Sequence, residues 1–169
     1  MKKIILTCVI LLLVAMTAVS AVLAHAPAGS ERADAESETV YIDSEEAFLR
    51  YVMNGVLDGS KNYVLTTDIY LDRYYLDRDV RSEGFDFNGA LDGRGHAIIG
   101  LKEALFGTLF ESAVVKNLNL IGVDIVANQN AAPLAMVNFG TITNVSVTGN
   151  VSGYNASGIV VSNFGTISD

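Results

Sequence analysis

Cysteine is nearly absent from this chain. The only one, Cys8, is among the first 24 of 169 residues, within a segment from Ile4 to Ala24 that carries no charge. Without Cys8 the chain has no thiol for a disulfide, for a metal site or for nucleophilic catalysis. Histidine is scarce as well, since His25 and His96 are the only two. A zinc peptidase site needs two histidines on one helical face beside a glutamate, so the sequence excludes it.

Basic residues are also few. The chain has 11 lysines and arginines against 19 aspartates and glutamates, for a net charge of −8. Without Lys2 and Lys3, nine basic residues remain against 19 acidic ones, and the net charge becomes −10. A polyanion of this size repels phosphate groups and anionic lipid head groups. We therefore expect no nucleic-acid partner and, after removal of a leader, no membrane partner.

The first 24 residues are typical of an export signal. A basic start precedes the uncharged segment, and small residues at Ala24 and Ala26 fit cleavage after either of them. The alternative is an uncleaved anchor, because an apolar segment of this length also spans a bilayer. Residues 1–24 are assigned to a signal peptide and residues 25–39 to a polar, disordered linker. The expected location is the cell surface or the secreted fraction.

Residues 40–83 are expected to form an N-terminal cap and the first strands. Asp43 and Glu46 are spaced as a capping box, and the apolar residues that follow recur at helical spacing. This pattern predicts a short amphipathic helix over residues 44–54. Residues 63–71 alternate and are rich in β-branched and aromatic side chains, which predicts a strand.

The C-terminal half contains a repeat of about 25 residues. The segment Asn138–Ile142 recurs as Asn163–Ile167, and extending this register gives six identities in 14 positions. A looser copy, Lys116–Gly122, matches Thr143–Gly149 at an offset of 27. Two or three copies of such a unit are typical of a solenoid, a propeller or an array.

The period inside each unit distinguishes these architectures. Apolar residues occur in pairs spaced by two, such as Leu118 and Leu120 or Val145 and Val147, which is strand periodicity. Glycine and asparagine recur every few residues and leave strands of only three to five residues, too short for propeller blades. The sequence thus predicts an all-β fold: a right-handed parallel β-helix over residues 84–169, with a short N-terminal capping α-helix.

Stacked coils align polar side chains in columns, and two structural ladders, hydrogen-bonded from coil to coil, are expected. Their members are Asn117, Asn144 and Asp169 in one column, and Asn138 and Asn163 in the other. Glycosylation is a rival interpretation of the Asn-x-Ser motifs that begin at Asn144 and Asn155.

The run Phe87–Leu101, which contains Asp-Gly-Arg-Gly-His, resembles the opening coil of bacterial surface proteins that carry GLUG repeats. The segments Leu105–Gly107 and Val115–Leu118 and the two Asn-Phe-Gly-Thr-Ile units are similar to the coils that come after it in those proteins. The similarity covers about residues 40–169. Of the glycine-rich strand that names the repeat, only the second glycine remains, as Gly158.

The resemblance implies an extracellular parallel β-helix, as in adhesin-like proteins and in the large N-terminal part of immunoglobulin A-specific metallopeptidases. In those enzymes the peptidase activity belongs to a separate C-terminal zinc domain, which this sequence does not resemble.

One cluster of carboxylates leaves an enzymatic alternative open. Its members are Asp68, Asp72, Asp77, Asp79, Asp86 and Asp92. Polysaccharide lyases and pectin-degrading hydrolases use β-helices with such aspartates, and hard oxygen ligands of this kind suit Ca²⁺. Interleaved Arg73, Arg78 and Arg81 favour ion pairing instead. No nucleophile motif accompanies His96, which is interpreted as a turn or stack residue. We therefore expect a non-enzymatic protein with no catalytic residues.

Binding or spacing remains as the function. A flat, outward-facing surface rich in hydroxyl groups is expected from Thr141, Thr143, Ser146, Thr148 and Ser152. Such a surface suits adhesin-like binding of a host or matrix glycan or protein, and it equally suits an inert stalk; an ice-binding face is a more distant third. Because the sequence stops in mid-repeat, we expect an incomplete solenoid from a larger protein, whose neighbouring repeats cover the open end.

Overall fold

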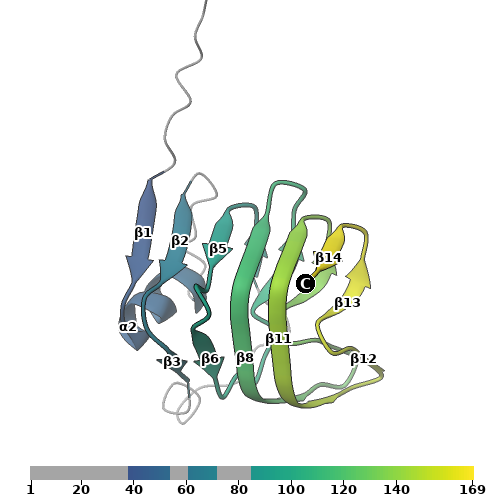
Figure 1. Cartoon of the computed structure of the whole chain (residues 1–169). Helices are drawn as coiled ribbons and strands as arrows, with labels where there is room; N and C mark the ends of the chain where they lie inside the picture. Colours follow the sequence, from purple (N-terminus) through teal and green to yellow (C-terminus); the bar gives the residue numbers. More distant parts are fainter. Residues whose placement is uncertain (1–37, 54–60, 72–84) are drawn as a thin grey trace, which may run out of the picture. The chain divides into compact units, whose positions relative to one another are not determined.

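The computed structural model describes residues 38–53, 61–71 and 85–169, all of which belong to the compact unit Ser37–Asp169. In this unit the chain winds as a parallel β-solenoid of about four turns, in which each strand pairs with its equivalent one coil later (Figure 1). The predicted all-β parallel solenoid with one short helix is confirmed. The signal-peptide assignment and nearly all of the linker lie outside the described residues.

The wall of the solenoid is built from strands β1 to β14. The first are β1 (Thr39–Ile42), β2 (Asn62–Leu65), β3 (Ile69–Tyr70), β4 (Phe85–Phe87), β5 (Ala90–Asp92), β6 (Ala97–Ile99) and β7 (Phe106–Leu109). The later ones are β8 (Val114–Val126), β9 (Asn130–Ala131), β10 (Ala135–Asn138), β11 (Thr141–Ser152), β12 (Asn155–Ala156), β13 (Val160–Asn163) and β14 (Thr166–Ser168).

Three parallel sheets form the faces of the coils. The largest has the order β1-β2-β5-β8-β11-β14. Two more strands belong to this sheet: β6 pairs with β8, and β3 pairs with β6. A second sheet has the order β13-β10-β7-β4, and a third pairs β12 with β9. In the repeat, Asn138 pairs with Asn163 and Thr141 with Thr166, which confirms the offset of 25.

The N-terminal end of the core is covered by a helix that differs in detail from the prediction. Helix α2 (Glu45–Phe48) continues into one π-helical turn, η1 (Leu49–Met53), and Phe48 and Val52 are fully buried. The capping-box prediction was wrong, because Ser44 is the N-cap and its side chain accepts a hydrogen bond from the Ala47 amide. Among the described residues, no helix is long and apolar enough to cross a bilayer.

Three details of the strands also differ from the sequence expectations. The strand predicted over residues 63–71 is two strands, separated where the Thr66 amide and hydroxyl both donate to the Ile42 carbonyl. Strands β8 and β11 have 13 and 12 residues rather than three to five, because their ladder bonds continue through the corners of the coil. Thr39, assigned to the linker, is already part of β1.

A β-bulge changes the register of the looser repeat. The offset of 27 holds from Thr143 paired with Lys116 to Val147 paired with Leu120, but Gly149 then pairs with Val123 instead of Gly122. Two residues of β8 therefore lie opposite Thr148 alone, which is the geometry of a bulge.

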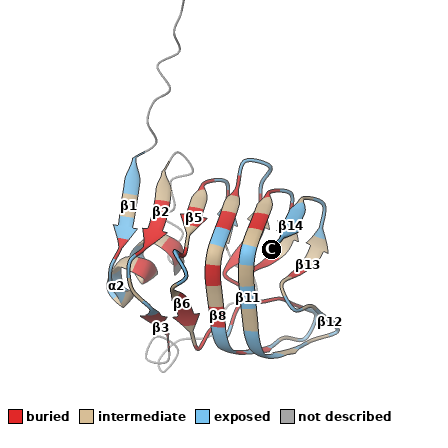
Figure 2. Ribbon diagram, viewed as in Figure 1, coloured by how far each residue is buried: buried red, intermediate tan, exposed pale blue. Residues whose placement is uncertain are grey.

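The core consists of apolar columns inside the solenoid, where Figure 2 shows the buried positions of adjacent strands aligned. One column contains Tyr63, Leu91, Val115 and Ile142. Each is at most 1% exposed, and burying such a side chain contributes about 1.5–3 kcal/mol. Next along the same column, Ile167 of β14 is 40% exposed.

Candidate functional site

All five hydroxyl residues predicted to form a binding surface lie on β11, at half-buried or exposed positions. They are Thr141, Thr143, Ser146, Thr148 and Ser152. The backbone of β11 is left-handed at Asn144, with φ 51°, and has φ 134° at Gly149. These residues interrupt the alternation, since Ile142 and Val145 both pack on the core although they are three positions apart. The hydroxyls are thus spread over three stretches of a curved strand (Figure 1).

Two of these hydroxyls are engaged between coils. The Ser146 hydroxyl donates to Asn119 Oδ1 at 2.6 Å, and the Thr143 hydroxyl lies 3.4 Å from the hydroxyl of Ser168. Thr148 and Ser152 are exposed. The outer wall of β11 is therefore partly a set of contacts that hold coils together and partly a free polar surface.

Asn117 and Asn144 share one column of side chains. Asn144 Nδ2 donates to Asn117 Oδ1 at 3.0 Å, and Asn117 Nδ2 donates to Asp92 Oδ1 at 3.1 Å. Each amide thus donates toward the preceding coil, and the Asp92 carboxylate is the first acceptor. Asp169 follows Ser168, which pairs with Thr143, so its register position is opposite Asn144. An ionised aspartate has no N–H to donate to Asn144.

Asn138 and Asn163 share a second column, which donates in the opposite direction. Asn138 is fully buried, and its Nδ2 donates to Asn163 Oδ1 at 2.7 Å. Asn138 Oδ1 accepts from the Gly140 amide at 3.0 Å, and Asn163 Nδ2 donates to the Gly165 carbonyl at 3.3 Å. Each asparagine therefore also organises the turn that follows its own strand.

Sequence reasoning missed the side-chain bonds of Asn119 and Asn130. Asn119 Nδ2 donates to the Gly95 carbonyl at 2.8 Å, and Asn155 Nδ2 donates to Asn130 Oδ1 at 3.0 Å. The signal was available, because Asn130 and Asn155 are 25 residues apart. The nitrogen that glycosylation would modify is a donor in both Asn144 and Asn155, so a glycan there would compete with these bonds between coils.

Three aspartates of the predicted acidic cluster accept backbone N–H groups. Asp68 accepts from Ala97, Asp86 from Thr108 and Asp92 from Arg94, each at 2.9 Å. Asp72, Asp77 and Asp79, like their neighbouring arginines, lie outside the described residues. No group of three or more metal-ligating side chains occurs in the part of the chain that the structure describes, so the calcium interpretation has no described ligand set.

The pKa values of Asp68 and Asp92 are both below the usual aspartate range. For Asp68 the main cause is the hydrogen bond from the Ala97 amide, assisted by His96 and opposed by partial desolvation. For Asp92 burial raises the pKa, but the Arg94 amide, the Asn117 side chain and Lys116 together outweigh it. Lys116 Nζ lies 3.4 Å from Asp92 Oδ2. These partners stabilise the charged form and suit a structural acceptor better than a general acid.

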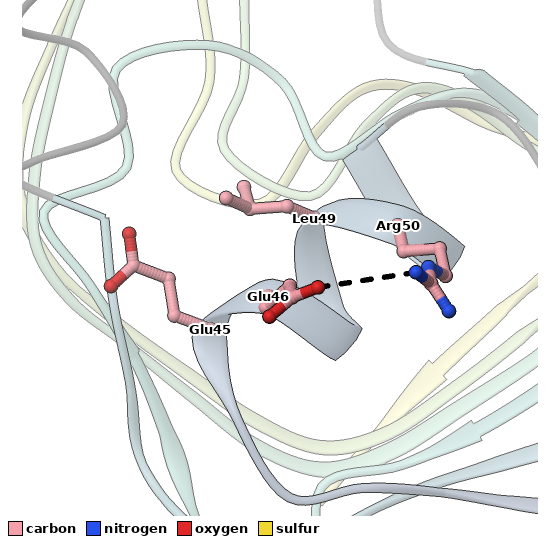
Figure 3. Close-up of a pocket in the computed structure, with 4 residues that line it drawn as sticks. All are labelled: Glu45, Glu46, Leu49 and Arg50. Carbon is pink, nitrogen blue, oxygen red and sulfur yellow. Dashed lines mark ion pairs between the residues drawn. The ribbon is translucent and has the colours of Figure 1, made fainter.

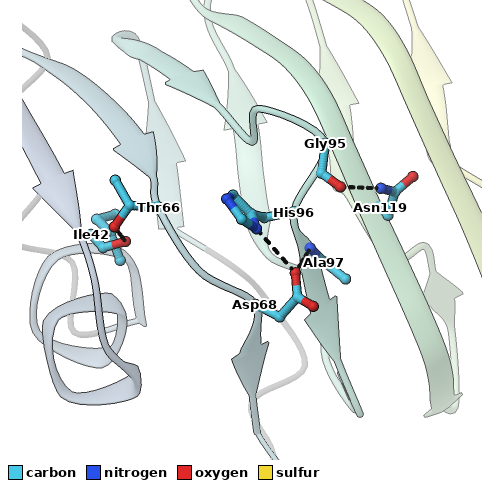
Figure 4. Close-up of polar contacts among 7 residues, drawn as sticks. All are labelled: Ile42, Thr66, Asp68, Gly95, His96, Ala97 and Asn119. Carbon is cyan, nitrogen blue, oxygen red and sulfur yellow. Dashed lines mark hydrogen bonds and ion pairs between the residues drawn. The ribbon is translucent and has the colours of Figure 1, made fainter.

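His96 pairs with Asp68 on the outer wall, as Figure 4 shows. Its Nδ1 lies 3.2 Å from Asp68 Oδ1, and both side chains are partly exposed. The same carboxylate oxygen accepts the Ala97 amide, so the pair joins the coil of β3 to the coil of β6. This placement suits the expectation that His96 is a turn or stack residue.

One pocket of about 470 Å³ lies beside the N-terminal helix (Figure 3). It is lined by Glu45, Glu46, Leu49 and Arg50, and Arg50 lies 3.9 Å from Glu46. Both of these charged side chains are largely exposed, so their attraction contributes at most about 0.5 kcal/mol. The lining thus supplies two carboxylates and one guanidinium, together with the apolar side chain of Leu49.

An exposed aromatic column was not foreseen from the sequence. Phe110, Phe139 and Phe164 each follow the last strand of a coil and donate their amide to the coil before. Phe139 and Phe164 stack with ring centroids 5.2 Å apart and an interplanar angle of 15°. All three are at least 43% exposed. The column therefore presents apolar rings on the outer surface.

Comparison with known proteins matches residues 38–149 to the family described as M26 IgA1-specific metallo-endopeptidase N-terminal region. A curated protein, halomucin of Haloquadratum walsbyi, is 28% identical over 140 residues. That match covers 72% of this chain but only 2% of halomucin, so the chain spans a small part of this relative. No solved structure matches the chain. The family match confirms the resemblance to the N-terminal part of immunoglobulin A-specific metallopeptidases.

Proposed function

This chain belongs to the family of M26 IgA1-specific metallo-endopeptidase N-terminal regions, and we propose that it serves as a non-catalytic stalk displayed outside the cell. This region is the non-catalytic part of those peptidases. The proposal adds two points to the family assignment, namely the role as a stalk and the location outside the cell. The leader-like start of the sequence supports the external location.

The bonding between coils is the observation that carries the stalk proposal. Side-chain hydrogen bonds join one coil to the next, as between Asn117 and Asn144 and between Asn138 and Asn163. In a binding site, such polar side chains would instead be free to contact a ligand. Side-chain ladders add to the parallel backbone pairing, and each coil lengthens the solenoid by about 4.8 Å. A wall built in this way is a stiff spacer.

The use of the carboxylates supports a non-catalytic role. Asp68, Asp86 and Asp92 each accept a backbone amide, and the pKa values of Asp68 and Asp92 are lowered. A glycosidase needs a pair of carboxyl groups, one of them with a raised pKa. The described aspartates therefore have a structural explanation that requires no substrate.

Hydrolysis assays test this part of the proposal. The purified chain is incubated with IgA1, and separately with polygalacturonate and Ca²⁺ while unsaturated product is monitored. We expect no cleavage of either substrate. Cleavage that disappears in Asp86→Asn, but persists in a variant at an aspartate remote from the cluster, Asp124→Asn, would contradict the non-catalytic assignment.

Adhesin-like binding is the second candidate, and the exposed phenylalanine column favours it. Aromatic faces pack against apolar faces of ligands, and the exposed hydroxyls of Thr148 and Ser152 add hydrogen-bonding groups on the outer wall. A glycan or matrix-protein ligand would combine both kinds of contact.

Glycan arrays distinguish the two candidates. A stalk shows no saturable binding to any glycan or matrix protein. An adhesin shows saturable binding. Phe164→Ser, which removes the most exposed ring of the phenylalanine column, weakens that binding, whereas Tyr70→Ser, at the other end of the solenoid, does not. Labelling of intact cells with an antibody against the domain tests external display in both cases.

A further inference from the structure

Three Asn-x-Ser motifs occur in the chain, and they begin at Asn144, Asn150 and Asn155. This motif is the acceptor sequence for N-linked glycosylation, which attaches a glycan to the asparagine Nδ2 and requires a hydroxyl group two residues later. The structure distinguishes the three motifs by how each uses its Nδ2 and its hydroxyl.

In two of the motifs the acceptor nitrogen joins neighbouring coils. Asn144 Nδ2 and the Ser146 hydroxyl both donate to asparagine side chains of β8, at 3.0 Å and 2.6 Å. Asn155 Nδ2 likewise donates to Asn130 Oδ1 at 3.0 Å. A glycan on either nitrogen would place a bulky sugar ring at a contact between coils.

The middle motif keeps both of its acceptor groups free. Asn150 and Ser152 are exposed on β11, and because they are two positions apart their side chains lie on the same face of the strand. Val151 between them packs against the core. Within the described part of the chain, neither the Asn150 side chain nor the Ser152 hydroxyl has a hydrogen-bond partner.

The exposure of Asn150 is a property of its position in the coil. In the register of the sheet, Asn150 pairs with Asp124 of β8. Asp124 has neighbouring coils on both sides, because β11 pairs with it on one side and the Leu101 carbonyl accepts its amide at 2.9 Å on the other. Asp124 is nevertheless exposed. A side chain at this position therefore stays open to solvent even between two coils.

We propose that Asn150 carries an N-linked glycan and that Asn144 and Asn155 do not. The proposal rests on the proposed location outside the cell, because N-linked glycans are typical of the surface of exported proteins. The donor is a sugar carried on a polyprenyl phosphate or diphosphate. A bond forms between Asn150 Nδ2 and C1 of that sugar, and the C1–O bond to the phosphate breaks. The released phosphate keeps the electron pair of that bond and takes up the proton that Nδ2 loses.

Mass spectrometry of glycopeptides tests the proposal. The chain is purified from the medium or the surface fraction of the cells that produce it and is digested, and the mass of each of the three motifs is measured. We expect a sugar mass increment on Asn150, whereas Asn144 and Asn155 should be unmodified.

Two variants at the third position of the motif, produced in the same cells, form a matched pair. Ser152→Ala removes the required hydroxyl and should lower the occupancy of Asn150 at least about tenfold, whereas Ser152→Thr keeps a hydroxyl and should retain the glycan. Thermal melts check that both variants are folded. The comparison of the three motifs in the unaltered chain stands without them.

Three results would overturn the proposal. They are an exported chain with no sugar on Asn150, equal occupancy of the three motifs, and a sugar on Asn150 that persists in Ser152→Ala. A chain that is unmodified and confined to the cytosol would contradict the external location as well, so failure of this proposal alone can be told from failure of both.

Discussion

Asn144 donates a hydrogen bond to Asn117 across 3.0 Å, and both residues have a left-handed backbone, with φ 51° and 53°. Each sits at a corner of its coil, where the chain bends without leaving the sheet. Asparagine is one of the few residues that tolerates this conformation at low cost. One residue type therefore supplies both the corner and the contact between coils.

Replacement of Asn144 separates these two roles. Asn144→Ala removes the hydrogen bond and places in the left-handed region an alanine, which tolerates it less well than asparagine, so the free energy of unfolding should fall by about 2 kcal/mol. Asn144→Gly removes only the hydrogen bond and should cost about 1 kcal/mol. Urea unfolding measures both. Asn150→Ala, an exposed position of the same strand, is the control, and an equal loss in all three variants would contradict the ladder role.

Asn138 should be the most sensitive ladder residue. Asn138→Ala leaves the Gly140 amide and Asn163 Oδ1 without their buried partner, which should lower the free energy of unfolding by about 2–4 kcal/mol. Asn163→Ala removes an exposed partner and should cost about 1 kcal/mol. The two variants are compared by chemical unfolding, and a larger effect at Asn163 would argue against this assignment.

Alanine substitutions at Gly140 and Gly158 test the close approach of successive coils, with Gly158 as the control at an open position. Gly140→Ala forces a Cβ atom against backbone of the preceding coil, and we expect a loss of at least about 2 kcal/mol or failure to fold. At Gly158 an added Cβ atom has no neighbour within 4 Å, so Gly158→Ala should be within about 0.5 kcal/mol of the unaltered protein. Thermal melts compare them, and similar melting temperatures would contradict the close approach.

Acid should weaken the fold through Asp68 and Asp92. Their folded-state pKa values are lowered, so these carboxylates stabilise the fold above their ordinary unfolded pKa. That contribution is lost as the pH falls through the folded-state pKa. We expect the melting temperature to decline below about pH 4. In the double variant Asp68→Asn with Asp92→Asn the decline should be shallower, and Asp124→Asn serves as control; an unchanged slope in the double variant would argue against the assignment.

Processing of the leader is predicted from the sequence alone. The mature chain should begin at His25 or Pro27, after cleavage behind Ala24 or Ala26. N-terminal sequencing of secreted or surface-released protein measures this directly. A chain that still begins at Met1, or that is confined to the cytosol, would count against export.

The repeat made the main features of the fold predictable. Identical segments adopt identical local structure, so the spacing between Asn138–Ile142 and Asn163–Ile167 was sufficient for the solenoid and for the register of its last coils. Strand periodicity and frequent glycine and asparagine excluded helical repeats. The buried face of the N-terminal helix, with Phe48 and Val52, likewise followed from spacing along a single segment.

Other features depend on contacts between residues far apart in sequence. The bulge opposite Thr148 moves Gly149 onto Val123, and no local pattern indicates which strand receives the additional residue. Asp68, Asp86 and Asp92 formed an acidic cluster in the sequence, but each accepts a backbone amide, in two cases from the next coil. The direction of each ladder is another such feature.

The sequence by itself determined that the chain is a parallel solenoid of short repeats, because periodicity is a local property of the chain. Only the tertiary structure decided which polar side chains join coils and which remain exposed. Asn138 and Asn144 are equally polar, yet one is fully buried and the other exposed. The difference arises because a side chain's burial and its hydrogen-bond partner are set by the coil stacked against it, 21 to 29 residues away in sequence.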